Sequence, residues 1–319
     1  MRRGWGWGEF FVDCELTSQM AYSDYFGYLP VNETFKLTLG TVGPIDKYQI
    51  ALQRFAEWTN ADGHVYPPLV HEETPSELGK AAATRSARPA ALYRLPPTHK
   101  LELPTQPDDR ELARYGVAAF LVHFLGLLYG RRCHFYDWWI DRRTSSTSIA
   151  DHSEPLVDET IYCVEKGHSQ WISWPQRQRI VMINAMYLKS RAHSYEMEWE
   201  RFQAEYQVFD ALYSIARVLK IVQQQTPHKN RIPVLCDAFS IPCDAAYVTP
   251  IVRLRNHLLH EAIWGNRMPG EARGDEAFHS SFWLNRLCQR VTLRLLGIDG
   301  PYARSAWWPI TGSVFRITR

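Results

Sequence analysis

The residues best suited to chemistry lie in the stretch RLRNHLLHEAIW, which runs from Arg253 to Trp264. Arg255 carries a guanidinium whose forked N–H donors match the oxygens of a phosphate or a carboxylate. Asn256, the next residue, can donate and accept hydrogen bonds. His260 carries the side chain that gains or loses a proton near neutral pH. Together these residues could bind an anion and move a proton beside it.

An ideal helix through this stretch gives Arg255 an unusual position. At about 100° per residue, the helix divides into two sides. The polar side holds Asn256, His257 and His260. Arg255 instead projects into the middle of the apolar stripe, where an unpaired guanidinium would cost several kcal/mol to desolvate. We therefore expect an acidic partner on another helix.

The stretch YEMEWERFQAEYQVFDALYSIARVLKIV supplies a candidate partner. Its aromatic residues line one face of a long amphipathic helix, and Asp210 falls beside that face. We therefore expect Asp210 and Arg255 to lie close in space. Two interpretations of the pair remain open: a buried bridge that fixes the register of two helices, or an acid that holds the guanidinium while its other donors bind an anion.

The elements around this site are predicted to be helical from residue 108 onward. A helix through RELARYGVAAFLVHFLGLLYG is expected to end at Gly130. Further helices are expected in WPQRQRIVMINAMYLKSRAHS, in the long aromatic stretch and in FHSSFWLNRLCQRVTLRLLG. The helix that carries Arg255 is expected to begin with Thr249 as its N-cap and Pro250 in its first turn.

Residues 1–104 have a different character. EFFVDCEL and TFKLTLGTV are β-prone, and DKYQIALQRFAEW is typical of a helix. A proline-rich segment then precedes the helical part, so we place the domain border near Pro104. The expected fold is α+β overall: a smaller strand-rich domain over 1–104, followed by a mainly α-helical bundle domain over 105–319.

Composition limits the classes of partner. The 36 Lys and Arg residues against 34 Asp and Glu give a net charge of +2, so no broad positive field indicates duplex DNA or a membrane surface. Any nucleic-acid contact must be local. The six cysteines form no CxxC pair, which predicts neither a zinc cradle nor a disulfide scaffold. The longest apolar run, VAAFLVHFLGLLY, is too short to cross a bilayer, and we expect a soluble, cytoplasmic protein.

The spacing of Arg255, Asn256 and His260 matches the Arg-polar-x-x-x-His signature of the HEPN superfamily of helical ribonucleases. The surrounding chain resembles the ApeA-like branch of that superfamily over roughly residues 108–297. The resemblance is carried, in chain order, by AMYLKSRAHSYEMEWERFQAEYQVFDALYSI, RIPVLCDAFSIP and VRLRNHLLHEAIW. It implies that the helical domain is a HEPN-type bundle.

The resemblance also implies a metal-independent endoribonuclease, without a cofactor, that assembles its site across a homodimer. His260 would take a proton from the ribose 2′-hydroxyl or give one to the 5′-oxygen leaving group. Arg255 would hold the scissile phosphate and stabilise charge on its oxygens. Asn256 would orient the imidazole or the RNA substrate. The products would be 2′,3′-cyclic phosphate and 5′-hydroxyl ends, because the nucleophile belongs to the RNA.

Neighbouring side chains have smaller expected roles. Asp210 and His257 are expected to support the site. Arg253 and Arg267 could contact the RNA backbone or could be ordinary surface charges. His257 and His260 have the spacing of a metal-chelating pair, but a third ligand is missing, so no metal site is predicted.

Cleavage of single-stranded RNA would harm the cell that makes the enzyme, so we expect a toxin or antiviral defence effector. Its control by a regulatory protein, a complex or a sensor is expected to involve residues 1–104. The alternative is a non-catalytic HEPN-like module that binds a nucleotide or a partner in a larger nucleic-acid-targeting complex. The intact Arg255 and His260 argue against that alternative, since a pure binding module has no requirement for the pair.

Overall fold

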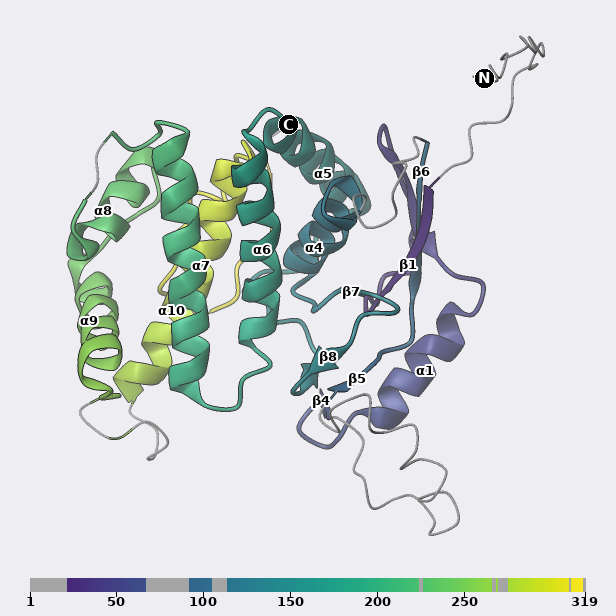
Figure 1. Cartoon of the computed structure of the whole chain (residues 1–319), viewed down its shortest axis with the longest axis horizontal. Helices are drawn as coiled ribbons and strands as arrows, with labels where there is room; N and C mark the ends of the chain where they lie inside the picture. The colour runs from purple at the N-terminus through teal and green to yellow at the C-terminus, as the bar shows by residue number, and fades with distance from the viewer. Residues whose placement is uncertain are drawn as a thin grey trace, which may run out of the picture.

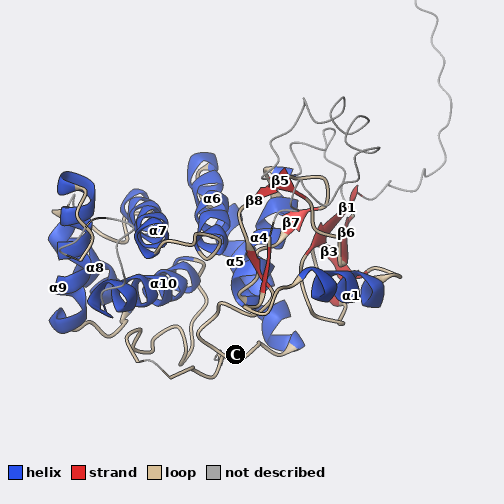
Figure 2. Ribbon diagram, turned by 90° about the horizontal axis from the view of Figure 1, so that it is seen from below, coloured by secondary structure: helices blue, strands red, loops and turns tan. Residues whose placement is uncertain are grey.

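The chain folds into a mixed α+β structure whose strands gather at one end (Figure 1), as the view coloured by secondary structure also shows (Figure 2). Helices α8 (His228–Phe239) and α9 (Ala245–Asn256) lie at the opposite end. The predicted α+β class is confirmed at this level. The computed structural model describes residues 22–66, 92–104, 114–223, 226–265, 268, 275–309 and 311–317.

The larger sheet is antiparallel and has the strand order β2-β3-β6-β1-β7. Alternate residues of β1 are buried, namely Tyr22, Asp24 and Phe26, so one face of the sheet meets the core. The strands predicted in TFKLTLGTV are confirmed as β2 and β3, whereas EFFVDCEL lies outside the described residues. The strands are β1 (Tyr22–Gly27), β2 (Phe35–Leu37), β3 (Gly40–Pro44), β6 (His99–Leu103) and β7 (His134–Phe135).

Strands on both sides of the expected domain border pair with one another. Strand β7 joins the larger sheet beside β1, and two small antiparallel sheets pair β4 with β9 and β5 with β8. Strands from both sides of the border expected at 104/105 therefore belong to the same sheets. Strands pair through backbone hydrogen bonds, and these can form between segments that are far apart in sequence. The short strands are β4 (His64–Val65), β5 (Leu92–Tyr93), β8 (Ile140–Asp141) and β9 (Thr144–Ser145).

Helices form the rest of the described structure. Helix α1 lies beside the sheet, and its prediction from DKYQIALQRFAEW is confirmed. The predictions of α4, α6, α7 and α10 are also confirmed, whereas α5 and α8 were not predicted. The bounds are α1 (Tyr48–Trp58), α4 (Val117–Tyr129), α5 (Val157–Ile172), α6 (Gln176–Ala192), α7 (Glu198–Val218) and α10 (Asp275–Leu295).

Helix α7 packs against both α6 and α10, and α8 and α9 pack against α10 (Figure 1). Helix α4 contacts α5, α6 and β7, so it joins the bundle to the sheet. Nearly every side chain of α4 is buried, which explains why its sequence is apolar on all sides. No helix in the described part of the chain has the length and apolar character needed to cross a membrane.

Helix α9 begins earlier than predicted. Its N-cap is Asp244, whose Oδ1 accepts a hydrogen bond from the backbone N–H of Ala246 at 2.8 Å. Thr249 and Pro250 lie inside the helix, so the expected start at Thr249 is wrong. An aspartate is among the strongest N-cap residues, and the two alanines after it extend the helix by a further turn.

A buried acid ties the C-terminal segment to helix α10. Asp151 Oδ2 lies 3.0 Å from Arg290 Nη1 and 3.3 Å from Arg286 Nε. The Tyr302 hydroxyl donates a hydrogen bond to Asp151 Oδ1. All these side chains are at most 3% exposed, so the charges depend on one another rather than on water.

The C-terminus of α4 offers a stability test. Gly130 caps this helix at φ 60°, where a Cβ atom would lie 2.4 Å from the backbone nitrogen of Ala150. Gly130→Ala should therefore lower the free energy of unfolding by about 2–3 kcal/mol, from the left-handed backbone and the displaced loop together. Urea denaturation checks this value. Gly297→Ala is the matched control: Gly297 also has positive φ, at 71°, but a Cβ there meets only side-chain atoms at 3.5 Å or more, so about 1 kcal/mol is expected.

Candidate functional site

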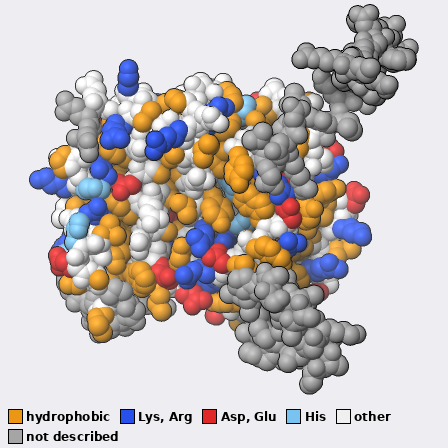
Figure 3. All heavy atoms as spheres, in the orientation of Figure 1, with side chains coloured by type: hydrophobic (Ala, Val, Ile, Leu, Met, Phe, Trp, Pro, Cys, Tyr) orange, Lys and Arg blue, Asp and Glu red, His pale blue; other side chains and the backbone are white. Residues whose placement is uncertain are grey.

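Helices α7, α8 and α9 bring the candidate residues together. Arg255 lies in the last turn of α9, and His260 lies in the turn that follows. His228 is the first residue of α8, while Tyr206 and Asp210 belong to α7. Histidine, basic and acidic side chains gather on the face of the molecule where these helices meet (Figure 3).

A change of helix type brings His260 to Arg255. The helix widens into a π-helical turn over His257–Glu261, in which the backbone N–H of Ala262 bonds to the carbonyl of His257. In an ideal α-helix, residues five apart point about 140° away from each other. A turn bonded from residue i to residue i+5 places them on nearly the same side. The π-turn therefore puts the imidazole of His260 beside the guanidinium of Arg255.

The guanidinium of Arg255 contacts three polar side chains. Its Nη1 lies 3.0 Å from Nε2 of His260 and 3.1 Å from Oδ1 of Asn256. Its Nη2 lies 3.4 Å from Nε2 of His228. Asn256 thus positions the arginine in this structure. Three of the five guanidinium donors are used in these contacts.

These contacts determine where the histidine protons are. A guanidinium can only donate hydrogen bonds, so Nε2 of His228 and Nε2 of His260 must both accept. Each imidazole is then neutral, with its proton on Nδ1. The two basic nitrogen atoms consequently point toward one cation.

Asp210 and Arg255 lie on either side of His228, but the ion-pair partner of Asp210 is a different arginine from the one expected. No ion pair joins Asp210 to Arg255 within the described residues; Asp210 Oδ1 instead lies 2.6 Å from Nη1 of Arg231. His228 lies between the two, with Nδ1 at 4.0 Å from Asp210 Oδ1. Arg231 reaches the acid because it is one helical turn after His228, on the same side of α8. The carboxylate charge is therefore matched by Arg231, and Arg255 has no acidic partner among the residues that the structure describes.

His228 is poised as a neutral imidazole. Its partial burial lowers its pKa, and the cations Arg231 and Arg255 lower the pKa further. Asp210 opposes this effect, since a carboxylate stabilises the protonated ring. His228 lies outside the set of site residues predicted from the sequence; the one local signal is its place directly after Pro227, at the start of an unrecognised helix.

The ring of Tyr206 lies against the guanidinium of Arg255. The Cζ atom of Arg255 lies 5.7 Å from the centre of the Tyr206 ring. Burial, together with Asp210, raises the pKa of Tyr206 to about 12. Its buried hydroxyl has no hydrogen-bond partner among the residues that the structure describes. Tyr206 therefore offers a protonated donor below the cluster.

Solvent reaches the cluster. Asn256 and His260 are exposed, and Arg255 and His228 are half-buried. The apolar stripe expected from an ideal helix is broken, since Leu259 is 47% exposed; the π-turn changes the side on which it projects. The structure thus leaves Arg255 and His260 accessible to a ligand from outside.

The remaining predicted residues lie around this cluster or outside the described chain. His257 is half-buried at the start of the π-turn, and Arg253 is exposed on α9. Arg267 lies outside the described residues. Trp264 is buried and packs against Phe202 at 5.3 Å between ring centres, so it anchors the chain after the π-turn.

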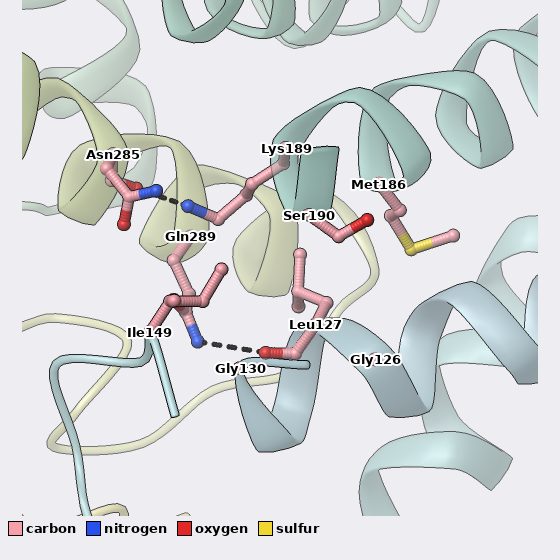
Figure 4. A pocket seen from close by; sticks show the side chains of 9 residues that line it. All are labelled: Gly126, Leu127, Gly130, Ile149, Met186, Lys189, Ser190, Asn285 and Gln289. Carbon is pink, nitrogen blue, oxygen red and sulfur yellow. Dashed lines mark hydrogen bonds between the residues drawn. The ribbon is translucent and has the colours of Figure 1, made fainter. Parts of the chain in front are cut away.

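The described part of the chain contains a small core cavity and no metal-binding group. No group of three His, Cys, Asp or Glu side chains there is arranged to hold a metal ion. A small cavity lies between α4, α6 and α10 (Figure 4), with room for roughly one water molecule. Lys189 in its wall donates to the backbone oxygen of Asn285 at 2.7 Å, and Gln289 donates to the backbone oxygen of Leu127. Its polar groups are thus paired within the core.

No protein-family model, curated protein or solved structure matches the chain. The case for a function therefore depends on the chemistry of the cluster formed by Arg255, Asn256, His260, His228 and Asp210.

The bridge between Asp210 and Arg231 can be tested by itself. Asp210→Asn should lower the free energy of unfolding by about 0.5–1 kcal/mol, because the pair is partly exposed. It should also lower the pKa of His228 further, since the raising effect of the carboxylate is lost. Urea denaturation and NMR titration of the His228 ring check the two results. Asp237→Asn, at an exposed position of α8, should leave both values unchanged.

Proposed function

We propose that this chain is a HEPN-type endoribonuclease that cleaves single-stranded RNA by attack of the ribose 2′-hydroxyl, without a metal ion. The observation that carries the proposal is the 3.0 Å contact between Arg255 Nη1 and His260 Nε2 on a solvent-accessible face. This contact places a guanidinium that can bind a phosphate beside an imidazole that can exchange a proton. π-helical turns inside α-helices are frequent at functional sites.

The charge of the cluster favours a phosphate. The partners of Arg255 are two neutral imidazoles and an amide, while the nearby carboxylate of Asp210 is paired with Arg231. An anionic phosphate would form stronger, charge-assisted hydrogen bonds with the guanidinium than these neutral groups do. Beyond the three donors in use, Nη2 keeps one donor and the Nε donor is buried, so a phosphate that contacts both terminal nitrogens replaces one of the neutral partners of Nη1. An RNA phosphodiester therefore suits the site.

The proton chemistry follows from the same contacts. When a phosphate takes Nη1 of Arg255, Nε2 of His260 becomes free to exchange a proton with the reacting oxygen atoms. The guanidinium then stabilises the charge that develops on the non-bridging oxygens. Both steps use side chains of this cluster.

We also propose the assembly and biological role that the resemblance implies. Two copies would place their Arg255 and His260 side chains together across a two-fold axis, which the exposure of His260 allows. The activity would serve as a toxin or antiviral defence effector under the control of a regulator. Sedimentation at several concentrations tests the dimer.

The experiment is cleavage of single-stranded RNA in EDTA by the native chain, Arg255→Ala and His260→Ala. We expect cleavage by the native chain and its loss in both variants. His64→Ala and Arg54→Ala are the matched controls, because His64 on β4 and Arg54 on α1 belong to the strand-rich end of the molecule. Both controls should cleave at the native rate.

Other outcomes would contradict the proposal in different ways. Undiminished cutting by His260→Ala would place the activity elsewhere. RNA binding by the native chain without cleavage would instead support a non-catalytic HEPN-like module. Inhibition by EDTA that added magnesium reverses would overturn the metal-independent mechanism.

A further inference from the structure

We infer that His228 is a second catalytic residue, the general base for the ribose 2′-hydroxyl, and that His260 is the general acid for the leaving oxygen. The inference rests on the proposed ribonuclease function. It places both proton-transfer groups in one chain, so in the proposed dimer each copy would supply its own acid and its own base.

The geometry of the guanidinium carries the inference. His260 Nε2 lies 3.0 Å from Nη1 of Arg255, and His228 Nε2 lies 3.4 Å from Nη2. The two basic nitrogens therefore contact different terminal nitrogens of one planar fork. A phosphate that bridges those two terminal nitrogens binds in a bidentate manner. We expect a phosphate bound in this way to lie between the two imidazoles.

Phosphoryl transfer requires this two-sided arrangement. The attacking and leaving oxygens lie roughly in line through phosphorus. One group must therefore remove a proton on one side, while another group delivers a proton on the opposite side. Two imidazoles on the same side of the phosphate could not serve both oxygens.

The surroundings of His228 assign it the role of base. The charged and titratable groups that face it are Tyr206 and Asp210 from α7, Arg231 from α8, Arg255 from α9 and His260 from the π-turn. Burial and the two arginines lower the pKa of His228, so the ring is neutral at neutral pH. Its Nδ1 lies 4.0 Å from Asp210 Oδ1, too far for a hydrogen bond, and the charge of that carboxylate stabilises the imidazolium formed when Nε2 takes a proton. Asp210 and Arg231 are positioning residues.

His228 and His260 together account for both proton transfers of the reaction. His228 Nε2 takes the 2′-hydroxyl proton while the 2′-oxygen forms a bond to phosphorus. The bond from phosphorus to the 5′-oxygen breaks, and that oxygen takes a proton from Nε2 of His260, which receives this proton from solvent after the bound phosphate has displaced Nε2 from Nη1 of Arg255. The products are a 2′,3′-cyclic phosphate and a 5′-hydroxyl. Proton exchange with solvent then returns His228 to its neutral form.

The experiment compares the native chain with His228→Gln and His260→Ala on two oligoribonucleotides. One has ordinary linkages, and the other has a sulfur atom in place of the 5′-oxygen at the cleaved linkage. A thiolate leaves without protonation, so a variant that lacks only the general acid recovers on the sulfur substrate. Glutamine at 228 keeps an oxygen that can accept from Nη2 of Arg255, so a merely structural role of His228 would survive the substitution. His64→Gln is the matched control.

We expect His228→Gln to be slower than the native chain by about 10²–10⁴ on both substrates. His260→Ala should be slow on the oxygen substrate and recover most of the native rate on the sulfur substrate. Native-like rates for His228→Gln on both substrates would overturn the inference and leave the ribonuclease proposal intact. Recovery of His228→Gln on the sulfur substrate would also overturn it, since His228 would then be the acid. A native chain that cuts neither substrate would instead refute the ribonuclease proposal itself.

The pH profile gives an independent readout. A general base must be deprotonated, so kcat/KM of the native chain should rise with pH on an acid limb that lies below about pH 6.5. This limb should disappear in His228→Gln. An unchanged acid limb in that variant would overturn the role of His228.

Discussion

Arg255→Lys should lower the rate of RNA cleavage by about 10²–10³ although it keeps the positive charge. Lysine offers a compact ammonium in place of a planar fork, so it cannot contact both Nε2 atoms of His228 and His260 and also bind a phosphate in a bidentate manner. Under the proposed mechanism most of the loss should appear in kcat, because the guanidinium would stabilise charge that develops in the transition state. Steady-state kinetics on single-stranded RNA check this result.

Stability separates this effect from unfolding. Arg255 is half-buried and is not paired with a carboxylate within the described residues, so Arg255→Lys should change the free energy of unfolding by less than about 1 kcal/mol. Arg54→Lys on helix α1 is the matched control and should alter neither quantity. Native-like cleavage by Arg255→Lys would show that the planar fork has no role.

Asp151→Asn should destabilise the fold by about 3–5 kcal/mol. The substitution keeps the shape of the side chain but leaves Arg286 and Arg290 buried without a negative charge between them. Tyr302 would also lose a charged acceptor. Urea denaturation at neutral pH measures the loss, and Asp299→Asn is the control. Asp299 pairs with arginines at a more exposed position, so about 1 kcal/mol or less is expected there.

The loss in Asp151→Asn should depend on pH. Burial alone would raise the pKa of Asp151, but Arg290, the Tyr302 hydroxyl and Arg286 outweigh burial and lower the pKa below its usual value. A lowered pKa stabilises the fold above the pKa of the unfolded chain, about 3.9, and this contribution is lost as pH falls through the folded value. The difference from the native chain should therefore be constant between about pH 7 and 5 and shrink below about pH 4. A difference that does not shrink as the pH falls below about 4 would contradict the ionic origin.

The helices of the bundle could be predicted where periodicity is strong. Helices α4, α6, α7 and α10 follow from apolar spacing, and the glycine end of α4 follows from Gly130. The pairing of strands could not be predicted, because β7, β8 and β9 are two-residue strands whose partners lie far away in sequence. Helix α8 was missed because Pro233 interrupts its pattern.

The site could be predicted in its residue types but not in its geometry. The spacing of Arg255, Asn256 and His260 identifies three residues whose side chains are in contact in the structure. An ideal α-helix, however, separates Arg255 from His260, and only the π-turn brings them into contact. The sequence does not show the distances between helices either, so the pairing of Asp210 with Arg231 rather than with Arg255 could not be predicted.

The 2′-hydroxyl of the RNA tests the central claim most directly. The native chain in EDTA would be incubated with an oligoribonucleotide, and with the same molecule carrying a single 2′-deoxynucleotide at the main cleavage position. We expect the first to yield fragments that end in a 2′,3′-cyclic phosphate, as identified by mass spectrometry, and the second to resist cleavage at that position. Cleavage beside the deoxynucleotide, or fragments that begin with a 5′-phosphate, would contradict attack by the ribose at Arg255 and His260.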